Sequence, residues 1–395
     1  MLTYPSLLQI ARIEQPPASW SRHADNALSR PLQDLLPTAV QLRQTAGAYP
    51  LPPEQIRQLD AMRRRIDGDP VLSGLFSVWY TVFFIEKDAS AEAYDRWPVP
   101  SSLDESEASL FRALVIFSGT AGLEQALHEH GLTAYRQACL NDYIENTCRH
   151  FDRHGVYGLL NEKMWWLWPV FLGRVFRVGR LSYEIGEYRS AYLVFRHHSG
   201  RHLLLAGELE QTYDETGHQA EHGEYQPVYT KTETFVRGNA FNEDGTFNPD
   251  PVTLDLSEWS SAVQPGDPII HLHIPGDGKL YPQAVQDSLK AAVPFFRQHF
   301  PELSFRLFVC HSWLLNTGLA QLLPADSNIL SFQSLFTLAL ANQDKDAIYS
   351  FIFDVPPCPL EQLTPRTSFH TRVLTFIRNG GRLWDGFGVF PFDGL

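Results

Sequence analysis

Residues 269–292, IIHLHIPGDGKLYPQAVQDSLKAA, constrain the fold of this chain more than any other stretch. An apolar strand runs into a turn that holds two glycines, an aspartate and a lysine, and a helix begins directly afterwards at Pro282. Glycine lets a ligand approach the backbone closely, and the first N–H groups of a helix have no partner within the helix. The stretch therefore predicts a strand, a turn and a helix whose backbone N–H groups can bind an anion.

The size and charge of the chain narrow the class of protein. Its 395 residues, 44% of them hydrophobic, can bury a large core and predict two domains. The 32 basic and 45 acidic residues give a formal net charge of -13, which argues against nucleic acid and against an anionic membrane as partners. A neutral or cationic substrate fits this charge better.

The cysteines and the N-terminus bear on the cellular compartment. The chain has four cysteines, and their spacing contains no CxxC pair: Cys139, Cys148, Cys310 and Cys358. Neither a zinc ribbon nor a disulfide framework is therefore expected. The N-terminus lacks a basic segment followed by a long apolar run, and no run of about 18 apolar residues occurs. We expect a cytoplasmic protein that does not enter a membrane.

The first part of the chain predicts an all-helical domain over residues 1–154. Prolines, capping residues and closing glycines bound four helical patterns: 52–68, 71–87, 102–119 and 132–155. The apolar run MWWLWPVFLG, 164–173, is too short to span a bilayer and predicts core. We expect this run and the apolar helix near 71–86 to cover each other across the domain boundary.

The second part, residues 155–395, predicts a mixed α/β domain. Strand patterns occupy 175–188, 190–200, 201–210, 268–275, 305–313, 329–338, 347–355 and 383–390. Helices are predicted over 282–299, 313–324 and 366–379, and the polar segment 211–250 predicts a long loop or an irregular excursion. A helix between two buried strands predicts a parallel pair at the centre of the sheet.

The spacing His273-x-x-Gly276-x-Gly278 resembles the [Arg/Gln]-x-x-Gly-x-Gly/Ala turn of the GCN5-related N-acetyltransferases, the GNAT proteins. Longer blocks extend the likeness: LGRVFRVGRLSYEIG, HIPGDGKLYPQAVQDSLKAAVPFFRQHFPE, VCHSWLLNTGLAQLLPADSNILSFQSLF and NGGRLWDGFG. They resemble bacterial acyltransferase-domain proteins that join an N-terminal helical domain to a GNAT-like C-terminal domain. The resemblance implies an acyl-CoA-dependent N-acyltransferase, with acetyl-CoA or another acyl-CoA as co-substrate and an amine of a small molecule or peptide as acceptor.

The resemblance also assigns roles by position. Backbone groups at His273 and Ile274 would face the pantetheine arm and the thioester, and Asn316 would either bind the pantetheine or cap a helix. The turn that would hold the pyrophosphate comprises Gly276, Asp277, Gly278, Lys279 and Leu280. Tyr281 stands where the family has Ser or Thr, so the helix needs another way to satisfy its first N–H groups.

Acyl transfer to an amine requires a base that works near neutral pH. We expect His311 in this role, with His273 as the second candidate and Ser312 as a possible proton donor; hydrogen-bonded core histidines are the alternative interpretation. Cys310 and His311 are neighbours on a strand and point to opposite faces, so they do not form a nucleophile and base pair.

Two other functions compete with acyl transfer. His271, His273 and His311 on neighbouring strands could form a three-imidazole zinc site in a metal-dependent hydrolase, although no carboxylate at a motif-like spacing accompanies them. A catalytically silent binding module with a GNAT fold is the third reading. We expect the transferase, which needs no metal.

Overall fold

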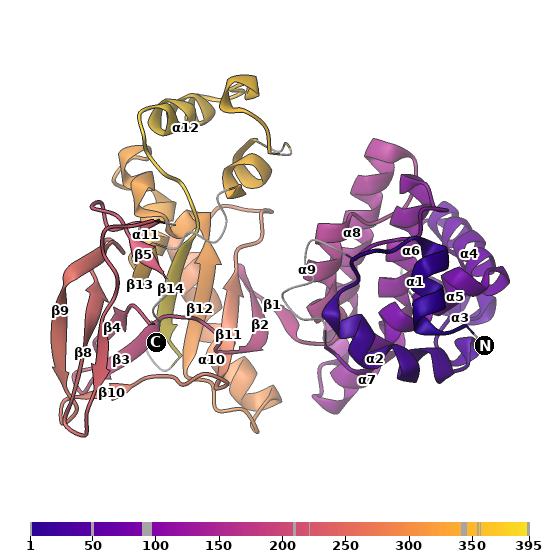
Figure 1. Cartoon of the computed structure of the whole chain (residues 1–395), viewed down its shortest axis with the longest axis horizontal. Helices are drawn as coiled ribbons and strands as arrows, with labels where there is room; N and C mark the ends of the chain where they lie inside the picture. The colour runs from indigo at the N-terminus through magenta and orange to yellow at the C-terminus, as the bar shows by residue number, and fades with distance from the viewer. Residues whose placement is uncertain are drawn as a thin grey trace. The chain divides into compact units, whose positions relative to one another are not determined.

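The computed structural model describes residues 2–48, 51–88, 97–207, 211–220, 222–340, 346–353, 355 and 357–392. The chain divides into two compact units, Met1–Phe176 and Arg177–Leu395. Figure 1 shows helices in the first unit and strands with flanking helices in the second. The division lies later than the expected boundary after residue 154, because helix α9 (Asn161–Phe171) packs on helices of the first unit.

The first unit is built from helices, as predicted. They are α1 (Tyr4–Ala11), α2 (Ala18–Ser29), η1 (Leu32–Asp34), α3 (Ala39–Ala48), α4 (Pro53–Gly68), α5 (Pro70–Tyr80), η2 (Thr81–Ile85), α6 (Glu105–Ser118), α7 (Thr120–Glu129), η4 (Thr133–Tyr135), α8 (Arg136–His154) and α9. Local signals set their ends. Asp69 caps α5, Asp104 and Glu107 form a capping box on α6, and Gly155 ends α8 at φ 74°.

Aromatic side chains fill the core of the helical unit. Trp79 and Phe83 contact the ring of Trp97, and Phe83 also contacts Trp165 and Trp168. The Trp168 indole N–H donates to the Phe83 carbonyl at 2.8 Å. The apolar stretches near 71–86 and 164–173 thus cover each other, but inside one unit. The expectation that they meet across a domain boundary is wrong, because both lie before Arg177.

The described residues contain no single helix that is long and apolar enough to cross a bilayer. The pair Pro53–Gly68 and Pro70–Ile85 reaches the required length and apolarity only when the two are taken together, and the pair is bent by 110°.

A six-stranded sheet organises the second unit, in the order β1-β2-β11-β12-β14-β13. Its strands are β1 (Val175–Val178), β2 (Leu181–Glu187), β11 (Pro268–His273), β12 (Leu307–Ser312), β13 (Thr337–Leu340) and β14 (Gly386–Pro391). β11 and β12 are parallel and are joined through helix α10 (Pro282–His299), whereas β2 and β14 flank them in antiparallel orientation. The predicted mixed sheet with a central parallel pair is confirmed.

A second sheet has the order β10-β3-β4-β8-β7, with β9 also paired to β8. The strands are β3 (Leu193–His197), β4 (His202–Leu205), β7 (Tyr229–Lys231), β8 (Phe235–Phe241), β9 (Phe247–Asp255) and β10 (Trp259–Ser261), and β5 (Thr212–Tyr213) with β6 (Gln219–Ala220) forms a separate hairpin. The long loop expected over 211–250 is therefore wrong. Buried Asn239 gives the reason, since its amide group donates to the Asn248 and Pro249 carbonyls and accepts from Val228 N–H.

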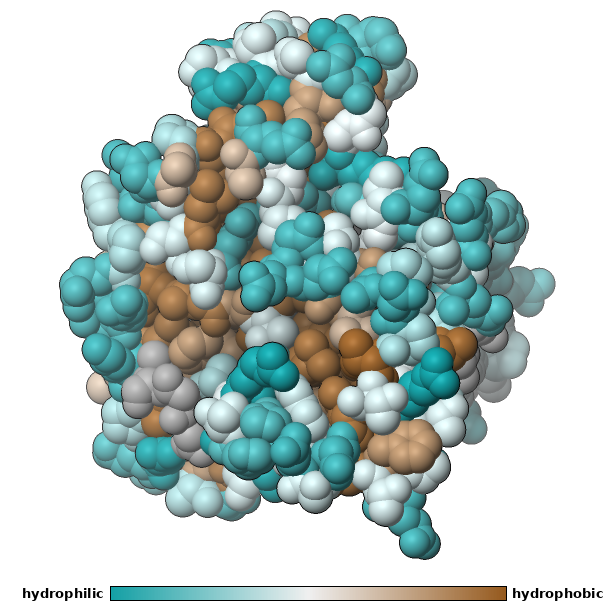
Figure 2. Space-filling model, turned by 90° about the vertical axis from the view of Figure 1, so that its left-hand side faces the viewer, coloured by the Kyte–Doolittle hydropathy of each residue, from teal (hydrophilic) through white to brown (hydrophobic). Residues whose placement is uncertain are grey.

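The two faces of the first sheet are covered differently. On one face Ile269, Val309 and Phe387 pack with residues of the second sheet and its hairpin in one core cluster. On the other face Tyr183 and Phe308 contact each other, and Tyr183 contacts Phe296 of α10. The face of the second sheet that points away from the first sheet carries a separate core cluster, which includes Phe195, Leu205 and Val236. Figure 2, which views the molecule from the left-hand side of Figure 1, shows hydrophobic side chains at the surface.

The regular elements between β12 and β14 are short helices and one strand. They are η5 (Trp313–Leu315), η6 (Thr317–Gln321), α11 (Asn328–Gln333), β13, η7 (Tyr349–Phe353), η8 (Leu360–Gln362) and α12 (Ser368–Arg378). The helix ending before Gly380 is confirmed. The single short helix expected over 313–324 is instead two 3-10 helices, η5 and η6, separated by Asn316, whose backbone is extended. The strands expected over 329–338 and 347–355 are wrong except at β13, because short apolar runs suit buried helices as well as strands, and the Ser327 cap starts α11.

Candidate active site

The glycine turn connects β11 to α10 as the sequence predicts. Tyr281 precedes α10 without a side-chain cap, and Pro282 occupies the first turn of the helix. The helix therefore begins with backbone N–H groups that no capping side chain satisfies. A Cβ atom on Gly276 would meet no atom within 4 Å, and one on Gly278 would meet only Arg180 Nε at 3.8 Å. Packing does not require glycine at either position, so a closely approaching ligand explains both residues better than the fold does.

Arg180 holds the inner side of this turn. Its guanidinium donates to the carbonyls of Pro275 and Lys279, both at 2.9 Å, and also to the Gly278 carbonyl. Asp277 accepts from Arg177 at 3.2 Å. Three carbonyl oxygens of the turn are thus engaged by one cation, which fixes the loop that leads into α10. The sequence did not predict this clamp on the turn.

The central parallel strands separate towards their carboxyl ends. Their paired register covers Ile270 with Phe308 and His271 with Val309. β11 continues to His273 and β12 to Ser312. The facing backbone groups beyond His271 and Val309 therefore lie outside the ladder and are available to a ligand that enters between the strands.

His271, His273 and His311 share one face of the sheet. His271 pairs with Val309, and side chains of paired residues point to the same side, as do residues two apart on a strand. Electrostatics agree with this placement, because the pKa of His311 responds to both of the other imidazoles. The sequence alone predicts that His271 and His273 share a face. The place of His311 on that face follows only from the register between β11 and β12.

His273 is held by a carboxylate that sequence reasoning missed. Its Nε2 lies 2.8 Å from Oε2 of Glu184 on β2, the strand on the other side of β11. The exposed fractions of the two side chains are 33% and 25%, so the pair lies at the edge of the site and not in the core. The signal in the sequence is weak: Glu184 is one of two acidic residues in the strand LSYEIGE, and it stands between Tyr183 and Ile185.

His311 combines solvent access with a crowded environment. The residue is exposed, and its ring centroid lies 4.8 Å from that of Phe387. Partial desolvation of the ring by surrounding protein atoms, together with the nearby His271 and His273, lowers the pKa of His311 to about 4. Burial also lowers the pKa of His271, against the opposing charge of Glu184. Both imidazoles are therefore neutral at neutral pH.

The remaining predicted residues have structural partners. Cys310 is buried, and burial raises the pKa of its thiol, as expected for a packed side chain facing away from His311. Ser312 Oγ accepts from Leu314 N–H at the start of η5. Buried Asn316 caps η6 through Gly318 N–H and donates to the Trp384 carbonyl. Asn316 therefore makes the capping interaction that the sequence left as the alternative to pantetheine binding.

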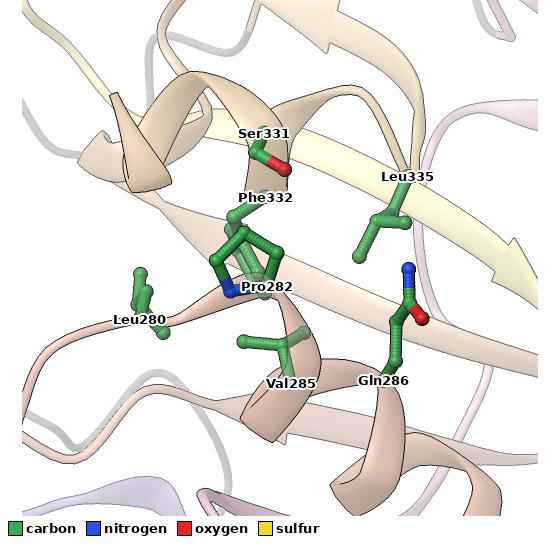
Figure 3. Close-up of a pocket in the computed structure, with 7 residues that line it drawn as sticks. All are labelled: Leu280, Pro282, Val285, Gln286, Ser331, Phe332 and Leu335. Carbon is green, nitrogen blue, oxygen red and sulfur yellow. The ribbon is translucent and has the colours of Figure 1, made fainter. Parts of the chain in front are cut away.

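A small cleft adjoins the turn and the start of α10 (Figure 3). It is shallow, with room for about 10 Å³, roughly one water molecule, between the segment entering α10 and helix α11. Its lining residues are mostly apolar: Leu280, Pro282, Val285, Gln286, Ser331, Phe332 and Leu335. Leu280 is thus placed at the edge of a recess. The sequence did not predict the contribution of α11, which was expected to be part of a strand.

In the part of the chain that the structure describes, no three His, Cys, Asp or Glu side chains form a group able to hold a metal ion. His271, His273 and His311 share a face, but they do not converge as metal ligands would.

A family model described as GNAT-like C-terminal domain matches residues 175–390. This range begins with β1 and ends within β14, so it spans both sheets and the glycine turn. No curated protein matches the sequence.

Solved structures share the fold over nearly the whole chain. An acyltransferase in complex with decanoyl-CoA and teicoplanin is 20% identical, with a TM-score of 0.65 and 99% of each chain covered. An acyltransferase mutant in complex with octanoyl-CoA is also 20% identical, with a TM-score of 0.65 and 98% of each chain covered. A further acyltransferase complex with decanoyl-CoA is 22% identical, with a TM-score of 0.61, covering 98% of this chain and 99% of the other. The likeness includes the helical unit.

Proposed function

The chain belongs to the family of GNAT-like C-terminal domains, and from that premise we propose that it is an acyl-CoA-dependent acyltransferase. One observation carries the proposal. A clamped glycine turn leads into an uncapped helix N-terminus directly beside the ends of two separating parallel strands. The first feature suits the pyrophosphate of coenzyme A, and the second suits its pantetheine arm and thioester.

We assign the parts of acyl-CoA to the parts of this site. The turn residues 276–280 and the first N–H groups of α10 bind the pyrophosphate. The edge of β11 that faces β12 beyond the paired register, at His273 and Ile274, binds the pantetheine amides. Asn316 is not part of this assignment, because its side chain is already engaged by Gly318 and Trp384.

The chemistry follows from a thioester placed between the strand ends. An amine nitrogen attacks the thioester carbonyl, a backbone N–H stabilises the oxyanion, and an imidazole accepts the proton released by nitrogen. The C–N bond forms, the C–S bond breaks, and the CoA thiolate leaves and is protonated. The Ser312 hydroxyl, which accepts from Leu314 N–H, is our candidate to relay this proton from water: it donates its own proton to the thiolate and takes one from a water molecule.

We propose a medium-chain acyl group and a small-molecule or peptide amine. The similar structures contain decanoyl-CoA and octanoyl-CoA, which supports chains longer than the acetyl group that the sequence resemblance suggested. One of them also contains teicoplanin, which supports an acceptor other than nucleic acid or lipid.

The proposal is tested by measuring CoA thiol release from acetyl-, octanoyl- and decanoyl-CoA, with and without primary amines. Glucosamine, short peptides and teicoplanin serve as acceptors, and mass spectrometry identifies the acylated product. We expect release that depends on the amine and is fastest with the longer chains. Amine-independent release would indicate a thioesterase, and CoA binding without turnover would indicate a silent binding module; either result contradicts the proposal.

A further inference from the structure

We propose that His273 is the general base of this site and that Glu184 is the residue that positions it. The inference rests on the proposed acyl transfer and deepens it, because it selects one of three histidines and adds a residue from a neighbouring strand. The proposal begins from the geometry of strands β2, β11 and β12.

The register of β2 and β11 brings the pair together. Glu184 lies opposite His271 in the antiparallel ladder, and His273 lies opposite Ser182. Side chains of Glu184 and His271 therefore point to the same face, and His273 is on that face two residues further on. The diagonal contact between Glu184 and His273 places the carboxylate and the imidazole 2.8 Å apart at the point where β11 leaves the parallel ladder.

Stability alone does not account for this pair. About a third of the His273 side chain and a quarter of the Glu184 side chain are exposed, and ion pairs of that exposure contribute roughly 0–1 kcal/mol. The turn that follows is already held by Arg180. An imidazole ordered by a carboxylate and still open to solvent suits proton transfer to an incoming substrate better than structural support.

The contact selects the nitrogen that acts as base. With Nε2–H donating to the Glu184 carboxylate, Nδ1 carries the lone pair that accepts the proton of the attacking amine. Glu184 then faces the imidazolium that forms and stabilises its charge, without taking the proton itself. The step moves one proton from the amine nitrogen to Nδ1 while the C–N bond forms.

The other charged and titratable groups around His273 favour the same assignment. His271 on β11 and His311 on β12 face it, and both are neutral at neutral pH, so they do not oppose the positive charge on His273. Arg180, on the approach to β2, is directed into the carbonyls of the turn. The pKa of His311 is lowered, which makes it the weaker base at neutral pH.

Four variants of the full-length protein test the inference: His273→Gln, His311→Gln, Glu184→Ala and Glu184→Gln. Glu187→Ala is the matched control, because Glu187 is on the same strand and is paired with Arg189 at the opposite end of the β2–β11 ladder. Steady-state kinetics use decanoyl-CoA and the best primary amine found for the wild type. Imidazole ¹⁵N spectra, assigned by the loss of the His273 signal, report the tautomer.

We expect His273→Gln to lower kcat by roughly 10²–10⁴-fold with little change in CoA affinity. Glu184→Ala should lower kcat by roughly 10²-fold, as for a catalytic group displaced by about 1 Å, and should remove the Nε2–H preference of His273. Glu184→Gln, whose amide oxygen can still accept from Nε2–H, should recover part of the loss. His311→Gln should cost less than His273→Gln, and Glu187→Ala should match the wild type.

Three results overturn the inference while leaving acyl transfer intact. The first is an active wild type in which Glu184→Ala keeps full kcat, and the second is a His311→Gln loss larger than that of His273→Gln. Loss of kcat in Glu184→Ala with an unchanged His273 tautomer would also overturn the positioning role. A wild type that binds no CoA contradicts the proposed function itself. Failure of the proposed function is therefore distinguishable from failure of the roles assigned to His273 and Glu184.

Discussion

His311 lies beside two other histidines on one face of the parallel strands, and this placement has a cost that depends on pH. Its pKa in the folded protein is lowered from 6.5 to about 4, first by burial and then by His271 and His273. Between these values the unfolded chain binds a proton that the folded chain does not. The contribution of His311 therefore lowers the free energy of unfolding as the pH falls from above 6.5 towards 4.

We expect this loss to be smaller in His311→Gln, which cannot be protonated. The free energy of unfolding, measured by urea denaturation at pH 7.5 and pH 4.5, should fall less in the variant than in the wild type. His271, whose pKa is also lowered, keeps part of the effect in both proteins. Equal losses in the two proteins would show that the His311 imidazole titrates near its ordinary value.

At this scale the sequence predicted some side-chain relations and missed others. The alternation of β-strand residues correctly separates Cys310 from His311 and unites His271 with His273. Glu184 could not be found in this way, because its contact with His273 depends on which strand lies beside β11 and in what register. The sequence also left open whether Asn316 binds the pantetheine or caps a helix, because its hydrogen-bond partner Trp384 is distant in sequence.

Among the elements, the glycine turn depends on an arginine from another part of the chain. Arg180 precedes β2, and its side chain, only 9% exposed, binds three carbonyls of the segment 275–279. Arg180→Ala leaves these carbonyls without their charged donor. We expect it to reduce the free energy of unfolding by roughly 1.5–3 kcal/mol, and to weaken CoA binding at least about tenfold because the turn loses its shape.

Arg189→Ala is the control for this prediction, because its side chain is 82% exposed and is paired with Glu187 outside the turn. Urea denaturation measures stability, and calorimetric titration measures CoA affinity. CoA affinity in Arg180→Ala equal to that of Arg189→Ala would mean that the turn keeps its shape without the clamp, or that CoA binds elsewhere.

The elements also differ in how well the sequence predicted them. The β11, α10 and β12 unit was predictable because apolar strands, a proline at the helix start and glycines at the turn agree with one another. β8 was missed because Gly238 and Asn239 usually mark turns, whereas here Asn239 makes its hydrogen bonds inside the sheet. η7 was taken for a strand because a short apolar run has no distinctive period.

In the whole molecule, the composition and the order of helices and strands predicted two units, but not the boundary between them. Helix α9 carries the apolar run MWWLWPVF that looked like the start of the second domain, and its Trp168 is bound to Phe83 of the helical unit. The contact between Trp168 and Phe83 shows that this run belongs to the helical unit, which the sequence did not reveal. The family match begins at residue 175, which agrees with a second unit that starts near Arg177.

The central claim concerns the whole chain: coenzyme A binds where the glycine turn leads into α10. Gly278→Val tests it, because a Cβ atom there meets no protein atom nearer than Arg180 Nε at 3.8 Å, and we expect the fold to stay intact. Gly122→Val is the matched control, since a Cβ at Gly122 also meets nothing within 4 Å and the residue lies in α7 of the helical unit.

The deciding measurement is a calorimetric titration of decanoyl-CoA into the wild type, Gly278→Val and Gly122→Val, each shown by circular dichroism to be folded. We predict that Gly122→Val binds like the wild type and that Gly278→Val loses binding, because the valine side chain occupies the space that the pyrophosphate needs. Equal affinity in all three proteins would contradict the account.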